Sequence, residues 1–310
     1  MRVVIIAVGS RGDVQPFVAL ARGLQAAGFE PVVATHDDFA AFVEGHGVPF
    51  ASIGGDAQAM VQHGPGLDWI ETGLRPIAFA RGFRGLLGPY VEQGIADAQR
   101  IAAGAAAIVT GGPGLFIGHS VAEKLGQPFI QAYLQPIHPT WTFPSPLFPT
   151  RRRHGPLFNI ASHLVAGPLF WHLMRPLLNR TRAQVLGLPR YPFNGPFIGL
   201  LRQRAPVLYG FSPAVLPKPR HWGDFIHVTG YWFLDAPEWT MPPDLAAFLA
   251  AGPPPVYIGF GSMGERDPAA TTRLVLDAVA RAGVRAVVHS GWAGLAEGDL
   301  PPAVHRIDGA

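Results

Sequence analysis

The stretch MRVVIIAVGSRGDVQPFVALARGL, residues 1–24, places an apolar run directly before a glycine-rich turn and a helical pattern. The run from Met1 to Val8 is rich in β-branched residues, as in a strand that is covered on both faces. From Asp13 to Ala27 apolar residues recur at helical spacing, and Gly28 follows as a C-cap signal. A strand, a loop and a helix therefore form the first unit of the fold.

Strands and helices continue to alternate downstream. EPVVATHDD (30–38) predicts a second strand, residues 37–45 a short helix, and GVPFASI (47–53) a third strand. This order is typical of a parallel sheet. Further strands are predicted at residues 105–112, 128–134, 205–211 and 224–232. The fold class is therefore predicted to be α/β, with a Rossmann-like, doubly wound N-terminal domain.

The middle of the chain departs from this alternation. Residues 54–75 predict a long surface loop, and a helix is expected from there to about Ala103. Residues 135–149 interleave prolines with aromatic residues, which predicts an irregular wall. Residues 157–186 predict one or two helices, with a break near Gly167 and Pro168.

Domain limits follow from composition. The N-terminal domain is expected to cover residues 1–233, and a proline-rich linker residues 234–254. PVYIGFGSM restarts the strand-and-loop pattern, so residues 255–310 are expected to form a second Rossmann-like domain. That segment is shorter than the roughly 100 residues of an ordinary domain, so the second domain is expected to be incomplete.

Composition excludes several classes of protein. The chain has no cysteine, which excludes disulfides and thiol chemistry and agrees with a cytoplasmic location. Its formal net charge of +3 is too small to indicate nucleic-acid binding. The N-terminus lacks a signal-peptide cleavage site and is interpreted as a strand.

The loop from Gly9 to Gly12 carries the first chemical signal. It lies where doubly wound folds bind ligands, directly before a helix whose free N–H groups favour an anion. Arg11 would assist an anion and Asp13 would repel one, so Asp13 could instead take a proton from a hydroxyl. An ordinary N-terminal cap explains Asp13 equally well from spacing alone. GSRGDV lacks the dinucleotide-binding spacing, which makes a nicotinamide enzyme a poor alternative.

Several segments together resemble a known family. VGSRGDVQPFVALARGL (8–24) and PPPVYIGFGSM (253–263) resemble specific motifs of sterol 3β-glucosyltransferases and their bacterial relatives. These belong to the inverting nucleotide-sugar glycosyltransferases that include the glycopeptide-antibiotic enzymes. Weaker matches follow in the same order: AEKLGQPF (122–129), LQPIHPTWTFPSP (134–146), VTGYWF (228–233) and HSGWAGL (289–295).

The resemblance implies a GT-B type fold, with an acceptor-binding N-terminal domain and a donor-binding C-terminal domain. It implies that Asp13 is the general base of an inverting reaction that uses neither a metal nor another cofactor. Ser10, Arg11 and Gly12 would contact the nucleotide sugar, together with Gly261 and Ser262 from the second domain. The family's further donor-binding segments are expected after Ala310, so this chain alone is expected to be inactive.

An apolar acceptor would meet aromatic residues. Trp141, Phe143, Phe148 and Trp171 are the candidates for acceptor binding, although simple packing explains each of them comparably well. Residues 150–182 combine basic ends with apolar side chains, so peripheral membrane contact is an alternative to ordinary helix packing there. The twelve histidines show no ligand spacing, and no metal site is predicted.

The sequence thus predicts a transferase that moves a hexose, expected to be glucose from UDP-glucose, to a hydroxyl of a sterol-like or other lipophilic acceptor. It is expected to act as a cytoplasmic monomer, with peripheral contact at the inner face of a membrane and no nucleic-acid partner. Two alternatives stay open at this point. One is a non-catalytic acceptor-binding fragment, and the other is an NAD(P)-dependent reductase.

Overall fold

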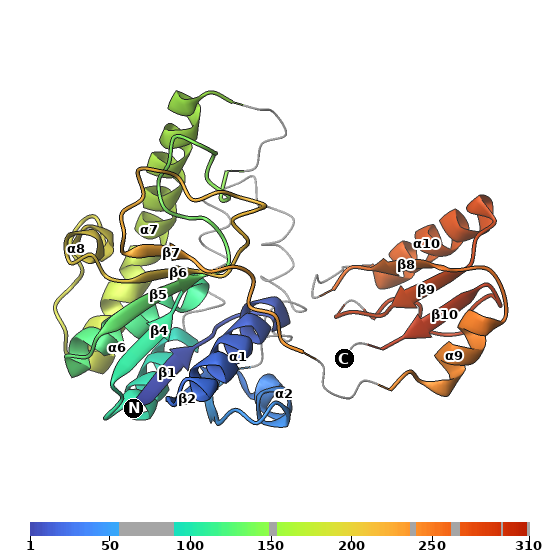
Figure 1. Cartoon of the computed structure of the whole chain (residues 1–310), viewed down its shortest axis with the longest axis horizontal. Helices are drawn as coiled ribbons and strands as arrows, with labels where there is room; N and C mark the ends of the chain where they lie inside the picture. The colour runs from blue at the N-terminus through green and yellow to red at the C-terminus, as the bar shows by residue number, and fades with distance from the viewer. Residues whose placement is uncertain (56–89, 149–153, 236–239, 262–266, 293, 309–310) are drawn as a thin grey trace. The chain divides into compact units, whose positions relative to one another are not determined.

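The computed structural model describes residues 1–55, 90–148, 154–235, 240–261, 267–292 and 294–308 (Figure 1). The chain divides into two compact units, with a boundary between Leu234 and Asp235. Each unit has its own parallel sheet and its own apolar core.

The first unit is built on a seven-stranded parallel sheet in the order β3-β2-β1-β4-β5-β6-β7. The strands are β1 (Arg2–Ile6), β2 (Glu30–Thr35), β3 (Phe50–Ser52), β4 (Ala107–Thr110), β5 (Phe129–Tyr133), β6 (Val207–Tyr209) and β7 (Ile226–Val228). Val4, Ile5 and Ile6 of β1 are all fully buried, which confirms a strand covered on both faces.

The order of strands reverses between β1 and β4. Val3 pairs with Ala107 and Ile6 with Thr110, so the two strands end level with each other. Doubly wound sheets bind ligands at the carboxyl ends of the strands that flank such a switch point. The loops that follow β1 and β4 therefore occupy the predicted ligand-binding edge.

Helices connect the strands of this unit. They are α1 (Arg11–Ala26), α2 (Ala40–Gly45), the helical residues 90–102, α6 (Leu115–Leu125), α7 (Pro156–Leu186) and α8 (Phe197–Arg202), with short 3-10 turns η1 (Asp37–Phe39) and η2 (Gly112–Gly114). The predicted loop at residues 54–75 and the start of the helix after it lie almost entirely outside the described residues.

Helix α7 runs unbroken for 31 residues, so the predicted break near Gly167 and Pro168 is wrong. Each proline inside a helix leaves the carbonyl four residues earlier without its partner. Pro168 is exposed, as is Leu164, whose carbonyl loses its bond, and water can therefore satisfy that carbonyl. Pro176 is exposed as well, and the helix continues past both prolines.

The second unit contains a three-stranded parallel sheet in the order β10-β9-β8. Its elements are α9 (Pro243–Ala250), β8 (Val256–Gly259), α10 (Pro268–Ala282), β9 (Ala286–His289) and β10 (Val304–Ile307). Helix α9 lies within the predicted linker 234–254 and packs in this unit, where Phe248 stacks on the guanidinium of Arg285 at 4.1 Å. Helix α9 begins at Pro243, and proline is compatible with the first position of a helix. The proline-rich composition of this segment therefore did not exclude a helix.

The switch point depends on close approach between β4 and its neighbours. A Cβ atom added to Gly111 would lie 1.6 Å from the carbonyl oxygen of Ala132 in β5. One added to Gly118 would lie 2.2 Å from Cγ2 of Thr110. A larger side chain at either position would overlap a neighbouring atom, so glycine is required at both. The two glycines allow α6 and β5 to pack closely against β4.

We expect Gly111→Ala to destabilise the first unit by about 3 kcal/mol, because the backbone of β5 must move to admit the methyl group. Gly23→Ala is the matched control, since no atom lies within 4 Å of its added Cβ on α1. That substitution is expected to stabilise the protein by about 0.5–1 kcal/mol. Urea denaturation of the two variants measures both effects, and equal midpoints would contradict the steric argument.

Candidate functional site

The loop after β1 turns sharply into α1. Gly9 has φ +132°, and a Cβ there would lie 2.3 Å from Oδ2 of Asp13. Only glycine combines this dihedral angle with such close contact. Ser10 follows in an extended conformation as the N-cap, so the loop is folded back against the first turn of the helix.

Asp13 lies in that first turn, at the switch-point edge of the sheet. Its Oδ2 accepts hydrogen bonds from the backbone N–H of Ser10 at 2.8 Å and from the Ser10 hydroxyl at 3.2 Å. Within the described part of the chain no hydrogen bond reaches Oδ1. Burial raises the pKa of Asp13 above its usual value, against the opposing effect of the two bonds from Ser10. The carboxylate is therefore held in place through one oxygen, and the other oxygen is available.

The arginine of this loop is already engaged within the first unit. Arg11 donates from Nε to Gln15 at 3.0 Å, and its guanidinium lies 4.6 Å from the ring centre of Phe42. Burial lowers the pKa of Arg11. Gly12 is exposed, and a Cβ there would meet only the Ser10 hydroxyl at 3.8 Å. The structure thus brings Ser10, Gly12 and Asp13 to one edge and directs Arg11 toward α2.

The other side of the switch point is made by the end of β4. The hydroxyl of Thr110 donates to the carbonyl of Ile6 at 2.7 Å, which joins the ends of the two strands. A Cβ on Gly114 would lie 2.6 Å from that hydroxyl oxygen. The turn η2 therefore lies against the end of β1, beside the loop that carries Asp13.

Three of the four predicted acceptor-binding aromatics lie on the irregular segment after β5. Trp141 and Phe148 are exposed, and the backbone carbonyl of Trp141 accepts from Asn159 of α7 at 2.9 Å. Phe143 is half-buried, with edge-to-face contacts to His163 and Trp222. These three side chains are placed on the carboxyl side of the sheet, at the surface or just beneath it.

Trp171 is a core residue in this structure, which corrects its placement among the acceptor-binding side chains. It is 1 % exposed, and its indole N–H donates to the carbonyl of Phe193 at 2.6 Å. Its ring packs against Phe116 and Tyr191. The helical periodicity could not show this, because apolar residues of α7 occupy both its buried and its exposed face.

In the second unit, the loop after β8 contains Gly261, and Ser262 lies outside the described residues. The carbonyl of Gly261 accepts from the N–H of Trp292 at 3.0 Å, which joins the loops that follow β8 and β9. Helix α10 begins shortly afterwards, and its N-cap Asp267 accepts from the N–H of Ala270 at 2.7 Å. Gly261 thus lies at the carboxyl edge of the second sheet, as doubly wound binding loops do.

Sequence reasoning missed a pair formed by buried Tyr209 at the end of β6 and partly buried His138 in the segment after β5. The hydroxyl of Tyr209 lies 2.5 Å from Nδ1 of His138 and accepts from the backbone N–H of His138 at 3.0 Å. Trp222 stacks on the ring of Tyr209. Burial, with a smaller contribution from nearby His163, lowers the pKa of His138 to about 4. This pair has no local sequence signal, because His138 and Tyr209 are far apart in the chain.

Sequence reasoning also missed Trp232 of the VTGYWF motif. Its ring packs edge-to-face on Phe17 of α1, one turn after Asp13, with the ring centres 5.9 Å apart. A Cβ on Gly210 would lie 3.0 Å from this indole, so the glycine makes room for it. The segment after β7 therefore returns across the carboxyl edge to the helix that carries Asp13 (Figure 1).

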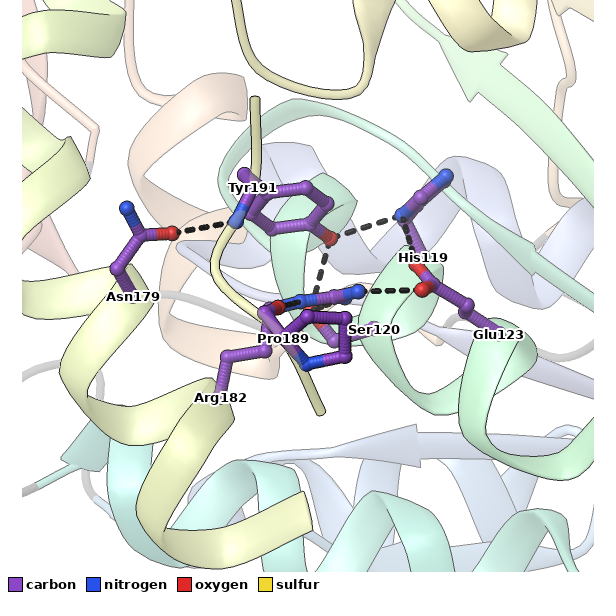
Figure 2. A network of polar contacts seen from close by, with 7 residues as sticks. All are labelled: His119, Ser120, Glu123, Asn179, Arg182, Pro189 and Tyr191. Atoms are coloured by element: carbon purple, nitrogen blue, oxygen red, sulfur yellow. Dashed lines mark hydrogen bonds and ion pairs between the residues drawn. The ribbon is translucent and has the colours of Figure 1, made fainter. Parts of the chain in front are cut away.

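A second polar network joins α6, α7 and the segment after α7 (Figure 2). Arg182 is 2 % exposed and lies 2.5 Å from Glu123, and it donates to the carbonyl of Pro189 at 2.7 Å. Its guanidinium stacks 4.0 Å from the ring centre of Tyr191. The Tyr191 hydroxyl lies 2.8 Å from Nδ1 of His119. These contacts hold the segment between α7 and α8 against α6.

Two partly buried histidines predict a pH dependence of stability. Burial lowers the pKa of His119 and of His138 from 6.5 to about 4. Between these values the unfolded chain binds more protons than the native one, so stability is lost as the pH falls from 6.5 toward 4.

We expect the midpoint of urea denaturation to fall as the pH is lowered from 6.5 to about 4. The double variant His119→Asn, His138→Asn keeps an acceptor near each Nδ1 position and cannot be protonated, so the fall should be shallower. An unchanged slope in the variant would show that other groups cause the pH dependence.

The part of the chain described here contains no group of three or more His, Asp or Glu side chains arranged to hold a metal ion. It also contains no helix with the length and hydropathy needed to cross a bilayer.

Comparison with known proteins agrees with this architecture. Residues 3–143 match the model of the glycosyltransferase family 28 N-terminal domain. A sterol 3-beta-glucosyltransferase of Cryptococcus neoformans is 35% identical over 338 residues, covering 99% of this chain and 20% of that protein. One of Neurospora crassa is 32% identical over 328 residues, covering 100% of this chain and 20% of that protein. The chain thus spans about a fifth of the length of these curated relatives.

Solved structures show the same fold. Spinosyn forosaminyltransferase SpnP has a TM-score of 0.54 at 16% identity, covering 99% of this chain and 69% of that one. A Streptomyces glycosyltransferase complexed with thymidine diphosphate has a TM-score of 0.52 at 19% identity, covering 100% of this chain and 71% of that one. The two α/β units therefore have the GT-B glycosyltransferase fold. Residues 3–143 are similar to the family 28 N-terminal domain, and nearly the whole chain is similar to part of the sterol 3-beta-glucosyltransferases named above.

Proposed function

We propose that the protein containing this chain transfers glucose from UDP-glucose, with inversion, to a hydroxyl of a sterol-like acceptor. The observation that carries the proposal is the placement of Asp13 at the β1/β4 switch point. One carboxylate oxygen is anchored by Ser10, and the other accepts no hydrogen bond within the described residues. The names of the relatives, sterol 3-beta-glucosyltransferases, support the class of acceptor and the sugar.

In the proposed reaction, Oδ1 of Asp13 accepts the proton of the acceptor hydroxyl while its oxygen attacks the anomeric carbon. The bond from that carbon to the diphosphate oxygen breaks, and UDP leaves with the bonding electrons. Attack from the side opposite the leaving group inverts the anomeric configuration. The raised pKa of Asp13 favours this role, since a base of higher pKa holds the transferred proton more strongly.

The donor is proposed to contact the glycine loops of both units. Ser10, Arg11 and Gly12 would take part in the first unit, and Gly261 and Ser262 in the second. Arg11 must leave Gln15 and Phe42 to reach a diphosphate. Binding of thymidine diphosphate by a structural neighbour supports a nucleotide-sugar donor. Neither a metal nor another cofactor is part of the proposal.

The acceptor is proposed to contact Trp141, Phe143 and Phe148, whose rings suit a flat apolar molecule. Trp232 is added to this set, because it packs beside the helix turn that carries Asp13. The protein is proposed to act as a cytoplasmic monomer in peripheral contact with the inner face of a membrane, where a lipophilic acceptor is dissolved.

A non-catalytic acceptor-binding protein is the second candidate. The bond from the Ser10 N–H to Asp13 favours it, because a carboxylate at this position caps α1 without any catalytic role. In that case the acceptor would bind and no sugar would be transferred.

The experiment incubates the full-length protein with UDP-glucose and a sterol, in the presence of EDTA. Mass spectrometry and proton NMR of the anomeric signal should show a β-glucoside formed from the α-linked donor. A retained α-configuration would exclude the proposed mechanism. Sterol binding without any glucoside would favour the second candidate.

A further inference from the structure

The first half of α7 has an inverted pattern of burial. The face turned inward carries polar side chains, among them Asn159, Ser162 and His163, all of them buried. The face turned outward is apolar, and Leu157 and Leu164 are 77% and 60% exposed. Ordinary surface helices have the opposite arrangement.

The outward residues form one continuous stripe. They follow Leu157 at intervals of 4, 7, 8, 11 and 12 residues, which is the spacing of a single helix face. The α7 stripe consists of Leu157, Ala161, Leu164, Val165, Pro168 and Leu169, and all six are exposed. No lysine, arginine, aspartate or glutamate occurs between Pro156 and Met174. An exposed apolar surface of this kind marks a contact site.

The charge of the sequence on either side of the α7 stripe indicates what covers it. From Lys124 to Gly223 the chain contains no aspartate or glutamate, yet this third of the sequence holds twelve of its 24 lysines and arginines. Arg190 and Arg202 are exposed within it. Three of the arginines reach acidic residues that lie outside this stretch: Arg180, Arg182 and Arg204. The stretch thus carries a strong excess of positive charge.

The position of the stripe connects it with the proposed acceptor. Helix α7 links β5 to β6, so it begins at the carboxyl edge of the sheet, where Asp13 also lies. At 31 residues it is about 46 Å long, and Figure 1 shows its first half projecting beyond that edge. Exposed Leu147 and Phe148 lie on the segment that precedes it.

We propose that the α7 stripe docks the first unit onto an anionic lipid bilayer. The stripe would enter the interface between headgroups and acyl chains, and the cationic stretch would be attracted to the anionic headgroups. A second copy of this chain fits less well, because it would present the same positive charge. The inference specifies the membrane contact of the proposed function, and it requires no transferase activity.

Co-sedimentation of the 310-residue chain with vesicles tests this proposal. Phosphatidylcholine vesicles that contain phosphatidylglycerol should bind the chain, and pure phosphatidylcholine vesicles should bind it far more weakly. Raising the salt from about 0.05 M to about 0.5 M should reduce binding to the anionic vesicles. Because neither donor nor acceptor is present, the result is independent of the proposed reaction.

The key variant is Leu157→Ser with Leu164→Ser, which removes apolar surface without changing charge. Losing the burial of two leucines should weaken binding to anionic vesicles at least tenfold. Leu274→Ser is the control, because Leu274 of α10 is 70% exposed in the other unit and should be neutral. Circular dichroism should show that all variants stay folded, as expected for exposed positions.

Equal binding by the stripe variant and the wild type would overturn the proposal, and so would an absence of binding to anionic vesicles. Light scattering measures the oligomeric state and so tests self-association as the alternative. A wild-type dimer that becomes a monomer in the stripe variant would assign this face to self-association, and the lipid proposal would then be wrong.

Discussion

Replacing Asp13 with Asn is expected to lower kcat of the full-length protein by roughly 10²- to 10⁴-fold, with little change in KM. The asparagine oxygen can still accept the N–H of Ser10, so the turn before α1 keeps its cap. What is lost is the negative charge that receives the acceptor proton. Steady-state kinetics with varied sterol and varied UDP-glucose measure both constants.

Ser10→Ala is the matched control for this variant. It removes the 3.2 Å hydroxyl contact to Asp13 and the donor contact proposed for that hydroxyl, and it leaves the 2.8 Å backbone hydrogen bond in place. Turnover should fall less than about tenfold, since the carboxylate keeps its charge and its main anchor. If Asp13→Asn retained wild-type turnover, Asp13 would be a helix cap and the proposed mechanism would fail.

Replacing Arg182 with Ala should lower the free energy of unfolding by about 3 kcal/mol. The substitution removes the ion pair with Glu123, the hydrogen bond to the Pro189 carbonyl and the stacking on Tyr191 (Figure 2). It also leaves a cavity where a buried side chain had packed. Urea denaturation measures the change.

Arg180→Ala provides the comparison on the same helix. Arg180 is exposed, and its Nε lies 4.0 Å from the carboxylate of Glu92, so this pair should contribute less than about 1 kcal/mol. If both variants lost a similar free energy of unfolding, the burial of Arg182 would add nothing to stability. That result would contradict a stabilising role of the network around Arg182.

Local patterns were sufficient for most of the fold. The apolar run from Met1 to Val8 and the helical spacing after Asp13 predicted β1 and α1, because strand and helix periodicity are properties of neighbouring residues. The same reasoning failed at residues 157–186 and at α9. The proline content of these segments predicts a break and a linker, whereas an exposed position in α7 and a first-turn position in α9 accommodate proline within a helix.

The candidate site was only partly predictable. The loop position of Ser10, Gly12 and Asp13 followed from the strand-loop-helix order. The contacts of Arg11 with Phe42 and the burial of Trp171 did not, since each involves residues from other elements. The proximity of Trp232 to the Asp13 helix likewise spans more than 200 residues of sequence.

The sequence by itself determined the α/β class, the order of the strands along the chain and the resemblance to sterol glucosyltransferases, because short apolar runs and motifs encode them. Tertiary structure alone decided which side chains are buried and which are free. It placed Trp171 in the core and turned the apolar face of α7 outward. Burial depends on packing between distant segments, and no local pattern contains that information.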